Sequence, residues 1–204
     1  MKKNLKWMVV AICLIIFIIT SVMVYTGSDI FIDSFLYEFI YKYFISDSVT
    51  EIVKSITFLG DVFGIILICI ASLFIFKDKR INMCIVSNLV IVTLLNNILK
   101  LIFMRERPSI NPLTVENTYS YPSGHSMVSM AFYGYLIYLI YNHISNRKIK
   151  YLLIGILSVL IFLIGISRVY LGVHYTSDVI GGFCFGISYI IIFVEISKKI
   201  IKKI

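Results

Sequence analysis

The sequence contains little proline and little charge for a chain of 204 residues. It has three prolines, and Asp, Glu, Lys and Arg together make up only 15% of the chain, against about 25% in an ordinary soluble domain. So few charges do not cover a water-facing surface, and 59% of the residues are hydrophobic. The scarcity of proline and the lack of low-complexity stretches also argue against a linker. We therefore expect a single domain over residues 1–204.

Cysteine motifs are missing as well. The four cysteines, Cys13, Cys69, Cys84 and Cys184, form no CxxC pair and lie near no histidine at metal-ligand spacing. We expect them to be small apolar packing residues. The formal net charge is +8, but the basic residues occur in short clusters between apolar runs. That distribution is typical of an integral membrane protein and excludes a nucleic-acid partner.

Long apolar runs predict membrane helices. A helix needs about 20 apolar residues to cross a bilayer, and six runs approach that length: Trp7–Tyr25, Ile52–Phe76, Ile81–Phe103, Gly124–Tyr141, Tyr151–Ile166 and Thr176–Ser197. The first run is too long for a typical signal peptide, so we expect a retained anchor. The predicted fold is an all-α, six-span transmembrane bundle.

The basic residues predict the orientation of these spans. Of the 19 Lys and Arg residues, 13 would lie on one side: Lys2, Lys3, Lys6, Lys77, Lys79, Arg80, Arg147, Lys148, Lys150, Lys198, Lys199, Lys202 and Lys203. By the positive-inside rule this side is cytoplasmic, and both termini lie there. The abundance of Ile, Lys, Asn and Tyr is typical of an AT-rich bacterial genome. The predicted location is therefore the bacterial plasma membrane.

The opposite side receives an acidic stretch and the chemically rich part of the chain. The acidic residues are Asp29, Asp33, Glu38, Asp47 and Glu51. Within this stretch, residues 30–45 are apolar with spaced acids, which predicts a helix lying at the outer membrane interface.

Three short stretches hold charged or titratable residues at the outer ends of predicted spans. They read KLIFMRERP (100–108), PSGH (122–125) and SRVYLGVHYTSD (167–178). Such groups are costly in a membrane and are a functional-site hypothesis by default. His174 and Asp178 are four residues apart, which would place them on one face of a helix. Topology would bring the three stretches to the same outer face.

The pooled residue types suit phosphate chemistry. Lys100, Arg107 and Arg168 supply cations for a tetrahedral oxyanion, and the Ser123–Gly124 turn would open a helix whose free amides bind anions. A histidine is a nucleophile at neutral pH, an aspartate orients it, and a second histidine protonates a leaving oxygen. The carboxylates do not cluster as hard-metal ligands do, so we expect neither a metal nor another cofactor.

These stretches resemble the signatures of the type 2 phosphatidic acid phosphatase superfamily of membrane lipid phosphatases. The spacings K-x6-R-P, P-S-G-H and S-R-x5-H-x3-D all fit, within a motif-bearing core of about residues 48–197. The resemblance implies that His174 attacks phosphorus and becomes a phosphohistidine, that Asp178 orients it, and that His125 protonates the leaving group. It also implies the groups that bind the phosphoryl oxygens: Lys100, Arg107, Ser123, Gly124 and Arg168.

The resemblance implies a lipid phosphate or diphosphate substrate at the outer leaflet. In a bacterium it suggests undecaprenyl diphosphate, with phosphatidylglycerol phosphate and then phosphatidic acid as alternatives, because the motifs recognise the phosphate and not the tail. The same residues would serve a phosphotransferase. A vanadium-dependent haloperoxidase has a similar anion site, but those proteins are soluble. A transporter is disfavoured because the charges gather at one rim instead of threading the bilayer.

The sequence leaves several residues without a settled role. Asp61 either touches the site or caps a polar cavity. Arg105 and Glu106 occupy variable positions of the first signature and either tune substrate choice or face water, and we favour water. The oligomeric state is not predicted.

Overall fold

The computed structural model describes residues 3–28, 30–109 and 111–201. Lys2, Lys202 and Lys203 of the basic clusters and Asp29 of the acidic stretch lie outside the described residues. All regular secondary structure in the described part is helical, which confirms the all-α prediction. The elements are α1 (Lys3–Tyr25), α2 (Phe31–Tyr43), α3 (Asp47–Phe58), α4 (Val62–Ile75), α5 (Lys79–Phe103), α6 (Gly124–His143), α7 (Arg147–Tyr170) and α8 (Thr176–Ile201).

The long helices start where side chains satisfy their free amides. Asp78 accepts a hydrogen bond from the backbone N–H of Arg80 at 2.8 Å and begins α5. Asn146 does the same for Lys148 at 3.0 Å and begins α7. Ser123 caps α6 through Ser126. These caps supply acceptors for amides that have no partner inside the helix.

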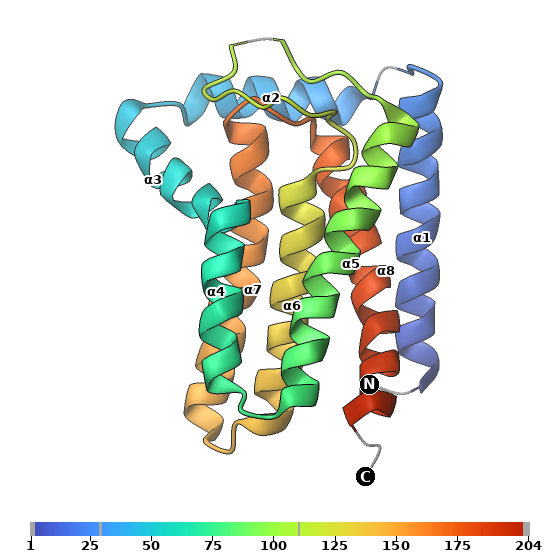
Figure 1. Ribbon diagram of the computed structural model, residues 1–204. Helices are drawn as coiled ribbons and strands as arrows, with labels where there is room; N and C mark the ends of the chain where they lie inside the picture. Colours follow the sequence, from blue (N-terminus) through green and yellow to red (C-terminus); the bar gives the residue numbers. More distant parts are fainter. Residues whose placement is uncertain (1–2, 29, 110, 202–204) are drawn as a thin grey trace.

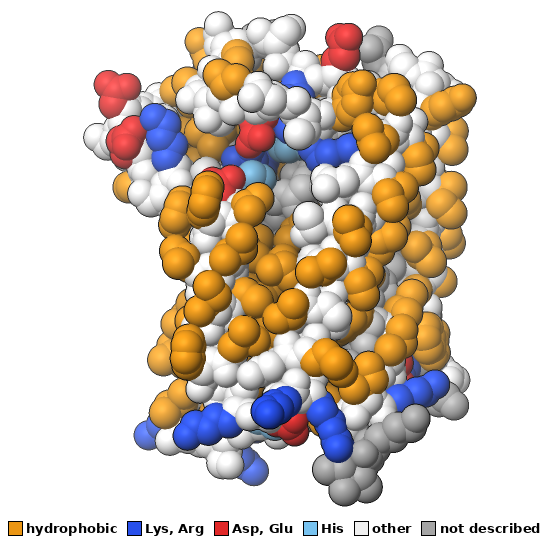
Figure 2. All heavy atoms as spheres, viewed as in Figure 1, with side chains coloured by type: hydrophobic (Ala, Val, Ile, Leu, Met, Phe, Trp, Pro, Cys, Tyr) orange, Lys and Arg blue, Asp and Glu red, His pale blue; other side chains and the backbone are white. Residues whose placement is uncertain are grey.

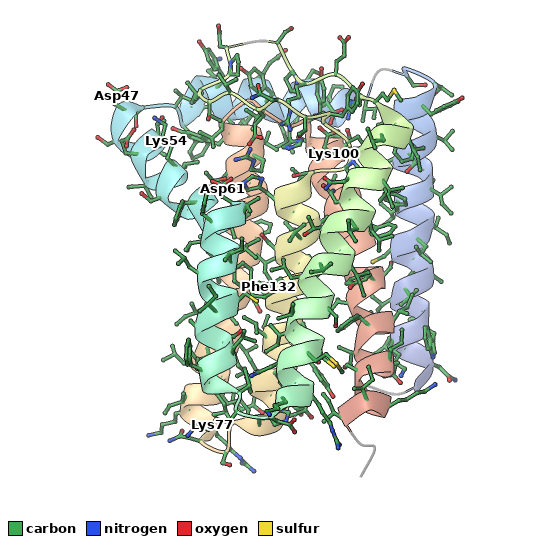
Figure 3. All side chains as sticks on the ribbon, viewed as in Figure 1. Asp47, Lys54, Asp61, Lys77, Lys100 and Phe132 are labelled. Atoms are coloured by element: carbon green, nitrogen blue, oxygen red, sulfur yellow. The ribbon has the colours of Figure 1, made fainter. Side chains whose placement is uncertain are left out.

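Helix α6 forms the centre of the bundle. Figure 1 shows α4, α5, α7 and α8 around it, with α1 packed against α8 and α2 lying across one end. Phe132, Tyr133 and Leu139 of α6 are completely buried, and Figure 3 places Phe132 midway along the bundle. The four cysteines are free and buried, as expected. A buried central helix gives the surrounding helices an apolar surface to pack on.

Four helices, α1, α5, α7 and α8, are long and apolar enough to cross a membrane. The pair α3 and α4 makes a fifth candidate if the two are counted as one span, although they are bent by 50°. Outward-facing side chains such as Ile15, Leu67 and Phe162 are more than half exposed. Figure 2 shows such apolar side chains over the middle of the visible face, as expected for a surface in contact with lipid.

The predicted span Ile52–Phe76 is wrong as a single helix. It breaks around Gly60 and Asp61, between α3 and α4. A Cβ atom at Gly60 would lie 2.5 Å from Ile164 and 2.9 Å from the ring of His125. The break therefore lets the backbone approach α6 and α7 closely, and it places Asp61 beside His125.

The basic clusters gather at the end of the bundle opposite α2. Figure 2 shows Lys and Arg side chains along this lower end, and Figure 3 labels Lys77 there, whereas Lys100 lies near the other end. The predicted interfacial helix at residues 30–45 corresponds to α2, Phe31–Tyr43. Its outer side chains Phe31, Phe35 and Tyr43 are exposed, while Asp33 is buried.

Candidate active site

The three signature stretches meet at the α2 end of the bundle, around one cavity. The cavity measures about 580 Å³ and is lined by five predicted site residues: Lys100, Arg107, Gly124, His125 and His174. The other three, Ser123, Arg168 and Asp178, are buried behind this lining. Figure 3 shows the labelled Lys100 and Asp61 approaching this region from α5 and from the α3–α4 break. All eight predicted residues therefore lie in one region of the fold.

His174 and Asp178 are paired, but not on one helix. Nδ1 of His174 lies 3.3 Å from Oδ2 of Asp178, and both side chains are almost fully buried. The expectation of a shared helix face is wrong, because α8 begins at Thr176 and His174 lies in the preceding loop. The loop bends so that Oδ2 also accepts the backbone N–H of Tyr175 at 2.9 Å and the hydroxyl of Ser120 at 2.5 Å.

Burial keeps the imidazole of His174 neutral. Loss of hydration lowers the pKa of His174 to about 3, and the hydrogen bond to Asp178 offsets only part of this effect. When Nδ1–H donates a hydrogen bond to Asp178, the lone pair of the ring lies on Nε2. Nε2 lies 3.2 Å from Nη1 of Arg107. The arrangement supplies a neutral nitrogen nucleophile beside a cation.

This buried neutral histidine predicts a pH dependence of stability. An unfolded histidine titrates near about 6.5, whereas folded His174 binds a proton only near pH 3. The unfolded state therefore takes up the proton first as pH falls, so His174 contributes stability above pH 6.5 that is lost toward pH 3. We expect the thermal midpoint in detergent to fall more steeply between pH 7 and pH 4 in the parent than in His174→Gln. Parallel curves would contradict the assignment.

His125 lies in the first turn of α6, facing the α3–α4 break. Its Nε2 lies 2.8 Å from Oδ1 of Asp61. The question left open by the sequence is thereby answered, because Asp61 touches the site. The two histidines differ in their partners: His174 faces a buried carboxylate, whereas the side chain of Asp61 is 43% exposed.

Two arginines hold a carboxylate that the sequence did not single out. Nη2 of Arg168 bonds to Oε1 of Glu116, and Nη2 of Arg107 lies 3.8 Å from Oε2 of the same side chain. Arg168 is 1% exposed, and its Nη1 also donates to Thr57 at 2.7 Å. A pair of guanidinium groups converging on one carboxylate is a geometry that suits a phosphoryl group.

The remaining predicted anion binders complete the cavity wall. Lys100 lies in the last turn of α5 and donates to the hydroxyl of Thr118 at 3.1 Å and to the carbonyl of Tyr119. Ser123 is buried, and its backbone N–H donates to the carbonyl of Asp178 at 3.0 Å. At Gly124 a Cβ atom would lie 2.9 Å from Asn96. The start of α6 is therefore packed tightly against α5 and α8, with the glycine allowing the close approach.

Residues 82–202 match the family model described as the PAP2 superfamily. This range contains all three signatures and all eight predicted site residues. The chain belongs to the PAP2 superfamily.

Two curated relatives are similar to this PAP2 chain. Phosphatidylglycerophosphatase B of Bacillus subtilis (strain 168) is 35% identical over 144 residues, which are 67% of this chain and 70% of the relative. Undecaprenyl-diphosphatase of Sulfolobus acidocaldarius is 34% identical over 143 residues, which are 66% of this chain and 65% of the relative. With the family match, these relatives make the chain a phosphoric ester hydrolase.

Two solved structures share the fold. The crystal structure of a transmembrane PAP2-type phosphatidylglycerolphosphate phosphatase from Bacillus subtilis is 28% identical, with a TM-score of 0.81 over 95% of this chain and 98% of the other. The crystal structure of Aquifex aeolicus LpxE is 25% identical, with a TM-score of 0.65 over 82% of this chain and 97% of the other. Together with the apolar helices, these similarities identify a multi-pass membrane protein.

Arg105 does not face water in this PAP2 site, contrary to the favoured sequence interpretation. Its side chain is only 17% exposed, and its guanidinium bonds to Asp178 at 2.6 Å and to Asp33 at 2.8 Å. The neighbouring Glu106 is exposed. Arg105 was missed because its signature position is variable and its partners lie 72 and 73 residues away.

Ser120 and Glu116 were also missed. Ser120 lies two residues before the PSGH stretch and is completely buried against Asp178. Its position next to a signature was the only sequence signal for it. No sequence signal pointed to Glu116, because it lies in a polar loop 52 residues from Arg168.

One group of side chains among the described residues could hold a metal ion. Single ligand atoms of Asp61, Glu116 and His125 lie within 4.8 Å of one another. Each already has a partner, since Asp61 bonds to His125 and Glu116 bonds to Arg168. A metal would have to displace a fully buried guanidinium from its carboxylate, which is costly. The metal-free reaction stays a prediction.

Proposed function

We propose that this PAP2 phosphatase hydrolyses a membrane lipid diphosphate, with undecaprenyl diphosphate as substrate and undecaprenyl phosphate as product. The carrying observation is the cavity of about 580 Å³, which is polar at one end and apolar along α4 and α5. Its apolar wall includes Val62, Ile66, Leu89 and Leu94. A lipid tail fits such a wall while its phosphate faces the cations. Figure 2 shows the charged and histidine side chains gathered above the apolar surface.

In the proposed reaction, the lone pair on Nε2 of His174 attacks phosphorus. A P–N bond forms as the P–O bond to the lipid breaks, and the electron pair goes to the leaving oxygen. His125, in its protonated form, gives that oxygen a proton from the Nε2 atom that now faces Asp61. Water then attacks the phosphohistidine, His125 takes its proton, and the P–N bond breaks to release phosphate. Asp178 accepts a hydrogen bond from Nδ1–H of His174 throughout.

The oxyanion would be bound by Lys100, Arg107 and Arg168 together with the start of α6 at Ser123 and Gly124. The support for this is that Arg107 and Arg168 already face one carboxylate, that of Glu116. A phosphoryl group with two negative charges competes well for such a pair, and Glu116 would leave as it binds. Preorganised cations of this kind stabilise charge that develops in the transition state.

For the membrane arrangement we favour six spans in one catalytic domain. Helix α6 has 20 residues and runs along the bundle beside α5, and α3 with α4 serves as one bent span. The basic clusters would lie on the cytoplasmic side of a bacterial plasma membrane with both termini, and the catalytic cavity would open on the outer side. The outer position matches a lipid substrate displayed at the outer leaflet.

Phosphatidylglycerol phosphate is the alternative substrate, because one of the two relatives is named for that lipid and the other for undecaprenyl diphosphate. Phosphatidic acid is the third candidate. The test is phosphate release in detergent, in excess chelator, from undecaprenyl diphosphate and phosphatidylglycerol phosphate side by side. We expect activity in chelator and a preference for the diphosphate. A preference for the other lipid would reassign the substrate. Loss of activity that added metal restores would overturn the metal-free reaction.

The same experiment separates hydrolysis from phosphotransfer. An alcohol acceptor is added, and the products are analysed for its phosphate ester. Hydrolysis predicts free phosphate as the main product at every acceptor concentration. Conversion of most of the substrate phosphate to the ester would make the chain a phosphotransferase acting through the same phosphohistidine.

A further inference from the structure

An ion-pair network lies behind His174, and two of its members, Asp33 and Arg105, have no part in the mechanism above. It joins Asp33 of α2, Arg105 of the loop after α5, and Asp178 of α8. We infer that Arg105 is a positioning residue that holds the carboxylate of Asp178 in line with His174, and that Asp33 holds Arg105 in place for this task. The inference rests on the proposed role of His174 as nucleophile.

The two oxygens of Asp178 have different partners. Oδ2 accepts from Ser120 and from the backbone of Tyr175 and faces Nδ1 of His174. Oδ1 accepts from Nη1 of Arg105 at 2.6 Å. A carboxylate bound on both oxygens does not rotate freely, so Oδ2 stays directed at the imidazole. Arg105 thus controls the orientation of the group that selects the tautomer of His174.

Arg105 is itself restrained on three sides. Its Nη2 donates to Oδ2 of Asp33 at 2.8 Å, its Nη1 also donates to the hydroxyl of Ser177 at 2.7 Å, and its guanidinium lies 4.0 Å from the ring centre of Tyr175. Asp33 in turn accepts the backbone N–H and the hydroxyl of Ser177, both at 2.7 Å. Because Ser177 is the residue next to Asp178, these hydrogen bonds tie α2 to the start of α8.

Charge balance explains why a cation stands at this point. Asp178 is 0% exposed and Asp33 is 7% exposed, so neither carboxylate is well hydrated. An ionised carboxylate without water needs a nearby positive charge or hydrogen-bond donors. The neutral His174 supplies no charge in the resting state, whereas Arg105 lies between both carboxylates. Without Arg105, the ionised form of Asp178, which accepts the hydrogen bond from Nδ1–H of His174, would be disfavoured.

The geometry calls for arginine and not merely for a positive charge. Nη1 reaches α8 while Nη2 reaches α2, and only a forked guanidinium offers two such donors in fixed directions. A lysine at this position would supply the charge to one carboxylate at a time. Arg105→Lys should therefore restore part of what Arg105→Gln loses.

The test compares Arg105→Gln, Arg105→Lys and Asp33→Asn with Glu38→Gln, which removes an exposed carboxylate from the same helix α2. We expect kcat to fall about 10–100-fold in Arg105→Gln with KM unchanged. Arg105→Lys and Asp33→Asn should lose less, and Glu38→Gln should keep the parental kcat. A rise in KM without a fall in kcat would overturn the inference, because it would place Arg105 on the substrate.

A second measurement is independent of turnover. The chain has three histidines, so ¹⁵N spectra of histidine-labelled protein report His174 once its signal is assigned by loss in His174→Gln. We expect the Nδ1–H tautomer in the parent and in Glu38→Gln, and a mixture in Arg105→Gln. A parental tautomer together with a parental kcat in folded Arg105→Gln would refute the positioning role. If the parent released no phosphate from either lipid, the proposed function would fail, and the tautomer comparison alone would decide this inference.

Discussion

His174→Ala is expected to lower phosphate release by about 10⁴-fold or more, the loss typical of removing a nucleophile that acts together with its partners. No neighbour replaces it, because the group nearest to its Nε2 atom is the cationic Arg107. Phosphate release from the preferred lipid, measured in chelator, checks this result. The acid-labile phosphoenzyme that the parent forms should also be missing from the variant.

A loss of activity in His174→Ala counts only if the bundle stays folded. His174 is 2% exposed, so its removal leaves a small void and frees Asp178 from one partner. His174→Asn, which keeps a donor near Asp178, is the second variant, and both are compared with the parent by size exclusion and thermal unfolding. His143→Ala is the matched control, since His143 lies at the other end of α6, where it bonds to the carbonyl of Leu139 and contacts the ring of Phe76. Near-normal release by a folded His174 variant would refute the nucleophile assignment.

His125→Ala is expected to lower turnover by about 10²–10⁴-fold, the usual contribution of general acid–base catalysis. The loss should depend on the leaving group. A lipid alkoxide needs the proton of His125, whereas a lipid phosphate or p-nitrophenolate leaves more easily without it. We therefore expect the largest loss with phosphatidylglycerol phosphate, a smaller one with undecaprenyl diphosphate and the smallest with p-nitrophenyl phosphate. The three rates, each divided by the parental rate, give the comparison.

The second half of the reaction gives an independent check on His125. Because His125 also activates water in the proposed mechanism, its removal should slow hydrolysis of the phosphohistidine. Rapid-quench experiments with p-nitrophenyl phosphate should then show an initial burst and accumulated phosphoenzyme in His125→Ala. Asp61→Asn, which keeps the shape of the partner of His125, should show a weaker effect. An equal loss with all three substrates and no burst would contradict the acid–base role.

Local patterns predicted much of the site but little of its surroundings. Spacing within three stretches identified all eight predicted residues, and the structure places them around one cavity. The break at Gly60–Asp61 was missed because the close packing of Gly60 on Ile164 and the ring of His125 joins residues far apart in the chain, which no local pattern reveals. Likewise, the helix rule for residues four apart paired His174 with Asp178 correctly but placed His174 on the helix, whereas it lies in the loop before α8.

The sequence by itself determined the class of this protein. Its apolar runs are long enough to demand helices in lipid, since every backbone group must be satisfied within its own segment, and the signatures carry the chemistry of phosphate in short spacings. Only the tertiary structure decided which charges meet. The contacts of Arg105 with Asp33 and of Glu116 with Arg168 join residues 72 and 52 positions apart. Such pairs form because packing brings charges together where little water reaches them, and local spacing in the chain does not reveal that choice.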